Sequence, residues 1–86
     1  MKEKRIGQVS HYYNGLHVAA VELEEAEMHV GDTIHVLGHT TNFVQPVRSL
    51  QLDHEFVNEG HQGESVGVRV DHHAREHDQV YLVIED

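Results

Sequence analysis

The stretch Val66-Gly67-Val68-Arg69-Val70 alternates apolar with other residues, so its three valines share one face of an extended strand. Arg69 lies on the opposite face and is expected to point outward. Residues 18–23 and 33–37 alternate in the same way, and residues 79–84 form a last apolar strand. The inward positions expected in the first two are Ala19, Val21 and Leu23, then Ile34 and Val36. A period of two over most of the chain predicts an all-β domain.

Residues 43–54 are predicted to form one long strand whose inward phase changes part-way. Phe43 and Val47 belong to one phase, whereas Leu50 and Leu52 belong to the other. A slip of one residue is typical of a β-bulge, and the proline at position 46 is compatible with a bulge or an edge.

Glycines mark the turns between these segments. Gly31 and Gly63 are expected to adopt positive φ, which costs glycine nothing. Gly67 lies inside a strand, where a glycine indicates a bend or a close approach of backbones.

About six short strands with such turns favour a barrel or a sandwich. A sheet this small has edges to hide, which favours closure. We therefore expect one domain, residues 1–86, forming a small closed antiparallel β-barrel of Greek-key type.

The composition restricts location and partners. The chain has no cysteine and no apolar run of the roughly 20 residues needed to span a bilayer, and its basic start is not followed by an apolar segment. We expect a cytoplasmic protein without a membrane partner. Fifteen acidic residues against six Lys and Arg give a formal net charge of −9, which repels phosphate backbones.

Catalytic motifs are absent from the sequence. Binding of nucleotide phosphates by a GTPase needs a G-x-x-x-x-G-K-[ST] loop, and the only lysines are Lys2 and Lys4. No G-x-S-x-G elbow surrounds a serine. The sequence predicts no enzyme activity, no nucleotide partner and no cofactor.

Ten histidines raise the question of a metal site. His73 and His77 are four residues apart in the densest cluster, residues 71–78. That spacing would direct both imidazoles at one ion on a helix, but this segment is expected to be a loop, and Arg75 would oppose a cation. His35 and His39 flank a glycine, so their relative geometry is undefined. No metal site is therefore predicted, although a metal-responsive or pH-responsive histidine protein stays open as a third hypothesis.

Four segments come in an order that resembles domain 2 of elongation factor Tu and related translational GTPases. They are RIGQV at 5–9, MHVGDTIHVLG at 28–38, VRSLQL at 47–52 and NEGHQGESVGV at 58–68. In the last of these, Gln62 replaces the alanine most common in that family. The C-terminal barrel of collagenase-like peptidases is similar as well.

The first resemblance implies a translation elongation factor-like binding module without a GTPase domain. Its partner would be a tRNA end, a ribosomal component or a translation factor. The second implies a protein-interaction adaptor or an accessory subunit of a larger enzyme. The candidate RNA-binding or partner-binding residues are Arg48, Arg69 and Arg75. An acidic surface favours a protein partner over RNA, and each arginine could instead form a surface ion pair.

Overall fold

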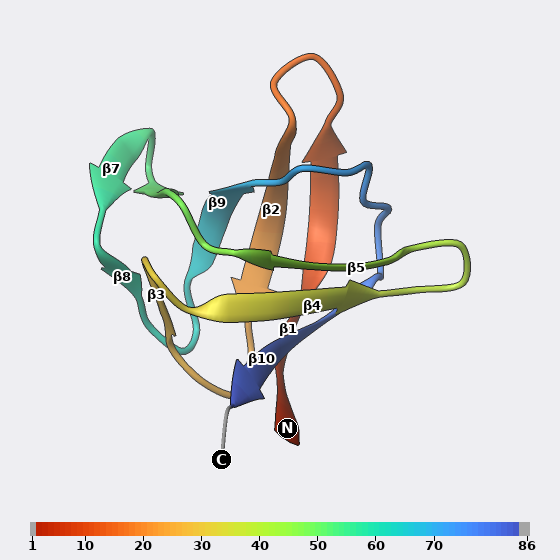
Figure 1. Cartoon of the computed structure of the whole chain (residues 1–86). Coiled ribbons are helices and arrows are strands. Elements are labelled where there is room, and N and C mark those ends of the chain that lie inside the picture. The colour runs from red at the N-terminus through yellow and green to blue at the C-terminus, as the bar shows by residue number, and fades with distance from the viewer. Residues whose placement is uncertain (1, 85–86) are drawn as a thin grey trace.

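The computed structural model describes residues 2–84, and in this range it contains ten β-strands and no helix (Figure 1). The strands are β1 (Lys2–Tyr13), β2 (Val18–Leu23), β3 (Met28–His29), β4 (Thr33–Leu37), β5 (Asn42–Pro46), β6 (Leu50–Leu52), β7 (Glu55–Val57), β8 (Glu59–Gly60), β9 (Ser65–Arg69) and β10 (Gln79–Ile84). No helix capable of crossing a bilayer occurs within this part of the chain. The all-β prediction is confirmed.

Eight strands form one antiparallel sheet in the order β5-β4-β10-β1-β2-β9-β6-β7, and β3 pairs with β8 in a separate two-stranded sheet. The sheet bends so that β4 and β5 pass across β2 and β9 (Figure 1). The two outermost strands, β5 and β7, are not paired with each other, so the predicted closed barrel is wrong. The strand count is also larger than the expected six, because several strands have only two or three residues.

A side chain joins the two parts of the bent sheet where a barrel would have a backbone ladder. Gln45 of β5 is buried, and its Nε2 donates a hydrogen bond to the carbonyl of Arg69 at 2.9 Å. Its Oε1 accepts one from the backbone N–H of Asp71 at 2.7 Å. One amide thus satisfies backbone groups on both sides of Val70 and links β5 to the segment after β9.

The predicted bulge lies in a different strand. Residues 43–54 do not form one strand, because Val47 leaves β5 and exchanges hydrogen bonds with the turn before β4. The Val47 N–H donates to the Asp32 carbonyl at 2.7 Å and its carbonyl accepts from the Gly31 N–H at 2.9 Å. The phase change between Val47 and Leu50 is therefore a break between β5 and β6.

The irregularities that bend the sheet are in β1. Its register shifts between Arg5 and Gly7 against β10, and between Val9 and His11 against β2. A Cβ at Gly7 would lie 1.9 Å from the carbonyl oxygen of Glu22, so only glycine fits at this position. β1 can therefore bend while it remains paired on both sides.

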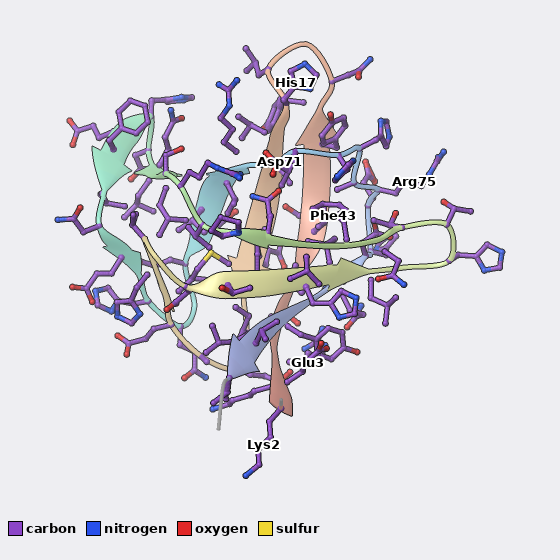
Figure 2. The ribbon with its side chains drawn as sticks, viewed as in Figure 1. Lys2, Glu3, His17, Phe43, Asp71 and Arg75 are labelled. Carbon is purple, nitrogen blue, oxygen red and sulfur yellow. The ribbon has the colours of Figure 1, made fainter. Side chains whose placement is uncertain are left out.

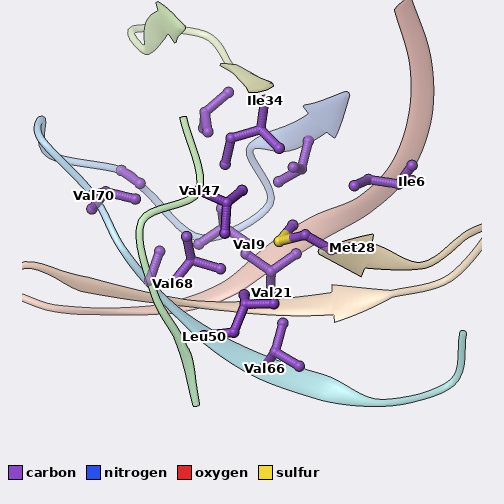
Figure 3. Packing of buried hydrophobic residues seen from close by; sticks show 14 of the residues in the cluster. Ile6, Val9, Val21, Met28, Ile34, Val47, Leu50, Val66, Val68 and Val70 are labelled. Carbon is purple, nitrogen blue, oxygen red and sulfur yellow. The ribbon is translucent and has the colours of Figure 1, made fainter. Parts of the chain in front are cut away.

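The core contains the inward residues predicted from the alternation. The expected side chains of β2, β4 and β9 are buried, together with Val70 just after β9 (Figure 3). Phe43, Val47 and Leu50 are buried as well, whereas Leu52 is only half-buried. Gly31 and Gly63 have φ values of 100° and 93°, so the prediction of positive φ is confirmed.

Candidate functional site

An open groove of about 530 Å³ lies between the β1–β2 hairpin and the β6–β9 part of the sheet. Tyr13 and Leu16 come from the end of the hairpin, and Val18 and Ala20 from β2. The other lining residues are Gln51, Asp53, His54, Ser65, Val66, Gly67 and Arg69. The groove is therefore built by strands that are far apart in sequence.

The register of the sheet explains the shape of the groove floor. Ala20 is paired with Gly67, and Gly67 is paired in turn with Gln51. Directly paired residues of antiparallel strands point to the same face, so these three form one row. Ala20 and Gly67 have the smallest side chains, so little side-chain volume fills the groove along this row.

At Gly67 a close approach of two backbones was one expectation, but the nearest atoms belong to side chains. A Cβ there would meet side-chain atoms first, at 3.3 Å from Val18 Cγ1 and 3.7 Å from Gln51 Cβ. Gly67 therefore leaves room inside the groove instead of allowing two backbones to touch. A larger residue at this position would fill the groove.

Large apolar side chains are exposed around this row. Leu16 is 65% exposed and Tyr13 is 46% exposed. Phe56 is paired with Gln51, so it extends the row beyond the groove, and it is 73% exposed. Exposed apolar side chains gathered on one face are typical of surfaces that bind another protein or a ligand.

The backbone around the groove is held in uncommon conformations. Among residues 2–84, the non-glycine residues with positive φ include His17 at 55°, Asp53 at 51° and His54 at 67°. His17 follows Leu16 at the tip of the hairpin (Figure 2). Asp53 and His54 form the two-residue connection between β6 and β7, where a type I′ turn needs positive φ at both positions. Such strain persists only where the surrounding structure fixes it, and it is common at binding sites.

The structure does not bring the three predicted arginines into one site. Only Arg69 lines the groove, and as predicted it points outward from the strand. Arg48 is paired with Asp71, with Nη1 2.8 Å from a carboxylate oxygen. Arg75 lies in the connection before β10 and extends away from the sheet (Figure 2).

The histidines suspected of binding metal have other neighbours. His73 packs on Tyr12 with ring centroids 4.3 Å apart, and His72 packs on Phe43 at 5.2 Å. His35 contacts Glu3 through Nδ1 at 2.9 Å and Asn42 through Nε2 at 2.6 Å. Neither His73 and His77 nor His35 and His39 belong to a group of three possible metal ligands within the described residues.

The pKa shifts lie at ion pairs outside the groove. A hydrogen bond to the Glu3 carboxylate raises the pKa of His35 above 6.5, although burial acts in the opposite direction. A hydrogen bond from Arg5 lowers the pKa of Glu24. A hydrogen bond to Glu27 raises the pKa of His61. These shifts follow from an acidic surface on which carboxylates meet histidines and an arginine.

Sequence reasoning missed the apolar part of the groove. Its one signal was an apolar residue, Leu16, next to the turn residues Asn14 and Gly15, where a polar residue is usual. The exposure of Phe56 depends on the short β6–β7 hairpin, whereas the sequence prediction placed β6 in a longer strand, residues 43–54, and no strand at β7.

Comparison with known proteins gives relatives among proteases. No protein-family model matches the chain. A Methanocaldococcus jannaschii protein named as a protease is 42% identical over 81 residues, which cover 93% of this chain and 20% of that protein. A Porphyromonas gingivalis collagenase is 30% identical over 77 residues, covering 88% of this chain and 21% of the collagenase. The chain thus spans about a fifth of the length of the curated relatives it matches.

Solved structures agree with these relatives. The C-terminal domain of a Geobacillus thermoleovorans protein assigned to the U32 peptidases superposes with a TM-score of 0.84 at 17% identity, covering 92% of this chain and 91% of that one. A selenomethionine variant of that domain gives 0.83 at 18% identity, covering 90% and 96%. The chain has the fold of a U32 peptidase C-terminal domain.

These findings overturn the resemblance to elongation factor Tu and the translation function drawn from it. The homologues are proteases, so the prediction of a translation-factor module that binds a tRNA end, a ribosomal component or a translation factor is wrong. The motifs that carried it are turn and strand signals. Gly31 and Gly63 are at positive φ because tight turns need it, and that need is not specific to one family. The alternative that involved collagenase-like peptidases agrees with the comparisons.

Proposed function

We propose that this chain is a non-catalytic accessory domain of a U32-type peptidase, and that its groove docks onto the catalytic part of that enzyme. The observation that carries the proposal is the mismatch in coverage. The M. jannaschii match includes 93% of this chain but only 20% of a protein named as a protease. The other four fifths of such a relative would hold the catalytic site and provide the surface onto which this domain docks.

The groove has the composition expected of a docking surface. Leu16 and Tyr13 present apolar area at its rim, and aromatic residues are enriched among the side chains that contribute most to protein binding. The strained turn at Asp53 and His54 fixes the opposite rim before binding, which lowers the entropic cost of association.

The charge of the chain supports the same kind of partner. A formal net charge of −9 favours a basic protein surface and accelerates encounter with one. No ion-pair partner of Arg69 is found among residues 2–84, so its guanidinium is available for an acidic group of the docked protein. In this proposal Arg48 and Arg75 lie outside the docking groove. The lack of cysteine leads us to place the complex in the cytoplasm.

Docking can be tested with the M. jannaschii protease from which the segment matching this chain has been deleted. Titration of this chain into that protein by calorimetry should show one-to-one binding, with a dissociation constant on the order of micromolar. A Tyr13→Ala, Leu16→Asp double variant should weaken binding at least tenfold, because it removes apolar contact and places a charge in the groove.

Val44→Asp is the matched control, because Val44 is 53% exposed on β5 and does not line the groove. It should bind like the unmodified chain. Equal loss in both variants, or no binding by the unmodified chain, would contradict docking through the groove.

A further inference from the structure

The two-stranded sheet of β3 and β8 carries a cluster of two histidines and two glutamates. His29 is paired with Glu59, and Met28 is paired with Gly60. Continuing this antiparallel register places Glu27 opposite His61. Met28 is buried in the core, so the alternating neighbours Glu27 and His29 lie on the outer face, together with Glu59 and His61.

Residues 27–29 and 59–61 thus each contribute one imidazole and one carboxylate, and each imidazole lies opposite a carboxylate of the other segment. The distances between these groups are short. His61 Nδ1 lies 3.0 Å from Glu27 Oε2, and His61 Nε2 lies 3.8 Å from Glu59 Oε2. His29 Nε2 lies 3.6 Å from the same Glu59 oxygen. One donor atom from each of Glu27, Glu59 and His61 falls within 4.8 Å of the other two.

The spacing of Glu27, Glu59 and His61 is compatible with three corners of a tetrahedral metal site. Ligand bonds of 2.0–2.2 Å to zinc place neighbouring ligand atoms about 3.4 Å apart. One ligand atom from each of Glu27, Glu59 and His61 lies within 4.8 Å of the other two, so small side-chain rotations bring the three to this spacing. Mixed imidazole and carboxylate ligands suit zinc and its neighbours in the transition series, whereas calcium and magnesium prefer oxygen alone.

Both histidines are anchored by a second carboxylate. The backbone N–H of His29 donates to Asp32 Oδ2 at 2.8 Å, and the ring Nδ1 of His29 lies 3.6 Å from the same oxygen. The backbone N–H of His61 donates to Glu64 Oε1 at 2.7 Å. The ring of His29 is oriented by Asp32 in the way that outer carboxylates orient metal-bound histidines, whereas Glu64 holds only the backbone of His61.

We propose that this face is a binding site for a divalent transition metal of the zinc class. Glu27, Glu59 and one nitrogen of His61 supply three ligands, and the fourth position is left to water. The metal bridges β3 and β8, which are held in their own small sheet outside the eight-stranded one. It also relieves the repulsion between the carboxylates of Glu27 and Glu59. This inference is independent of the groove and of its proposed partner.

The test is a titration of the full chain, free of any histidine tag, with Zn²⁺ at pH 7.5 by calorimetry and by thermal melting. We expect one strongly bound ion per chain and a rise in melting temperature, because the ion binds the folded state. Glu59→Gln and His61→Ala should each raise the dissociation constant at least tenfold and remove most of the thermal shift. Both side chains are about half exposed, so neither variant should prevent folding.

His11→Ala is the matched control, because His11 faces a single carboxylate, Glu76, at 3.6 Å. It should bind zinc as the unmodified chain does, and the imidazole nitrogen shifts that change most on adding zinc should be those of His61. Unchanged affinity in the Glu59 and His61 variants would overturn the proposal. Weak binding spread over several ions per chain would do the same.

Discussion

The side chain of Gln45 and the backbone of Asp71 are joined by a hydrogen bond of 2.7 Å, which links β5 to the segment after β9. The same amide donates to the carbonyl of Arg69, so one buried side chain satisfies two backbone groups. The bent sheet is held at this point without a backbone ladder. This contact is one of several that hold β5 against the rest of the fold.

Replacement of Gln45 by alanine should therefore lower the free energy of unfolding by about 1–3 kcal/mol, because two part-buried backbone groups lose their partner. Gln8→Ala serves as the control, since its amide donates to an exposed carboxylate of Glu24, and it should cost less than about 1 kcal/mol. Urea unfolding measures both. Equal and small effects would show that the Gln45 bridge contributes little.

The bend in β1 depends on Gly7. Gly7→Ala should lower the free energy of unfolding by about 2–3 kcal/mol, because the new methyl group would meet the Glu22 carbonyl and push β1 from β2. Gly15→Ala is the comparison, because nothing lies within 4 Å of a Cβ at that position. The melting temperature of Gly7→Ala should be clearly lower than that of Gly15→Ala. Similar melting temperatures would contradict the requirement for glycine at position 7.

The turn at Asp53 and His54 stores removable strain. His54→Gly should raise the free energy of unfolding by about 0.5–1 kcal/mol, because glycine adopts a φ of 67° without steric cost. His54→Ala keeps the Cβ and should give no such gain. Denaturant midpoints of the two variants decide between relief of strain and an effect of the imidazole itself.

The contact between His35 and Glu3 should make stability depend on pH. The folded pKa of His35 is raised by its hydrogen bond to Glu3, so protonated His35 stabilises the fold at pH values below the unfolded pKa of about 6.5. That contribution is lost as the pH rises through the folded pKa. The imidazole titration followed by NMR should have its midpoint above 6.5.

Glu3→Gln should move this midpoint down and reduce the difference in melting temperature between pH 5.5 and pH 8.5. Glu76→Gln should leave the His35 midpoint unchanged, because Glu76 faces His11 instead. An unshifted midpoint in Glu3→Gln would contradict the assignment of the raised pKa to this pair.

The sequence predicted those features that depend on local alternation and turn chemistry. The valines of β9, the inward residues of β2 and β4, and the positive φ of Gly31 and Gly63 all follow from neighbours in the chain. The open sheet was not predictable in this way. Gln45 links β5 to residues about 25 positions away, and an inward glutamine does not differ from a surface one in a sequence pattern.

The groove and the metal cluster could not be predicted from the sequence for the same reason. The groove requires the register of β2, β9 and β6, which sets Ala20, Gly67 and Gln51 in one row. The metal cluster requires β3 and β8 to pair across about 30 residues of chain. Histidine spacing along the chain directed attention to His73 and His77, whereas cross-strand pairing brings different histidines together.

The central claim is that the groove docks onto the catalytic part of a U32-type peptidase. Its most direct test is amide NMR of this chain during titration with the M. jannaschii protease that lacks the matching segment. We predict that the largest shift changes and line broadening map to residues that line or flank the groove, namely Leu16, Gly67, Arg69 and Phe56. Changes centred on β4 and β5, or no change at all, would contradict the account.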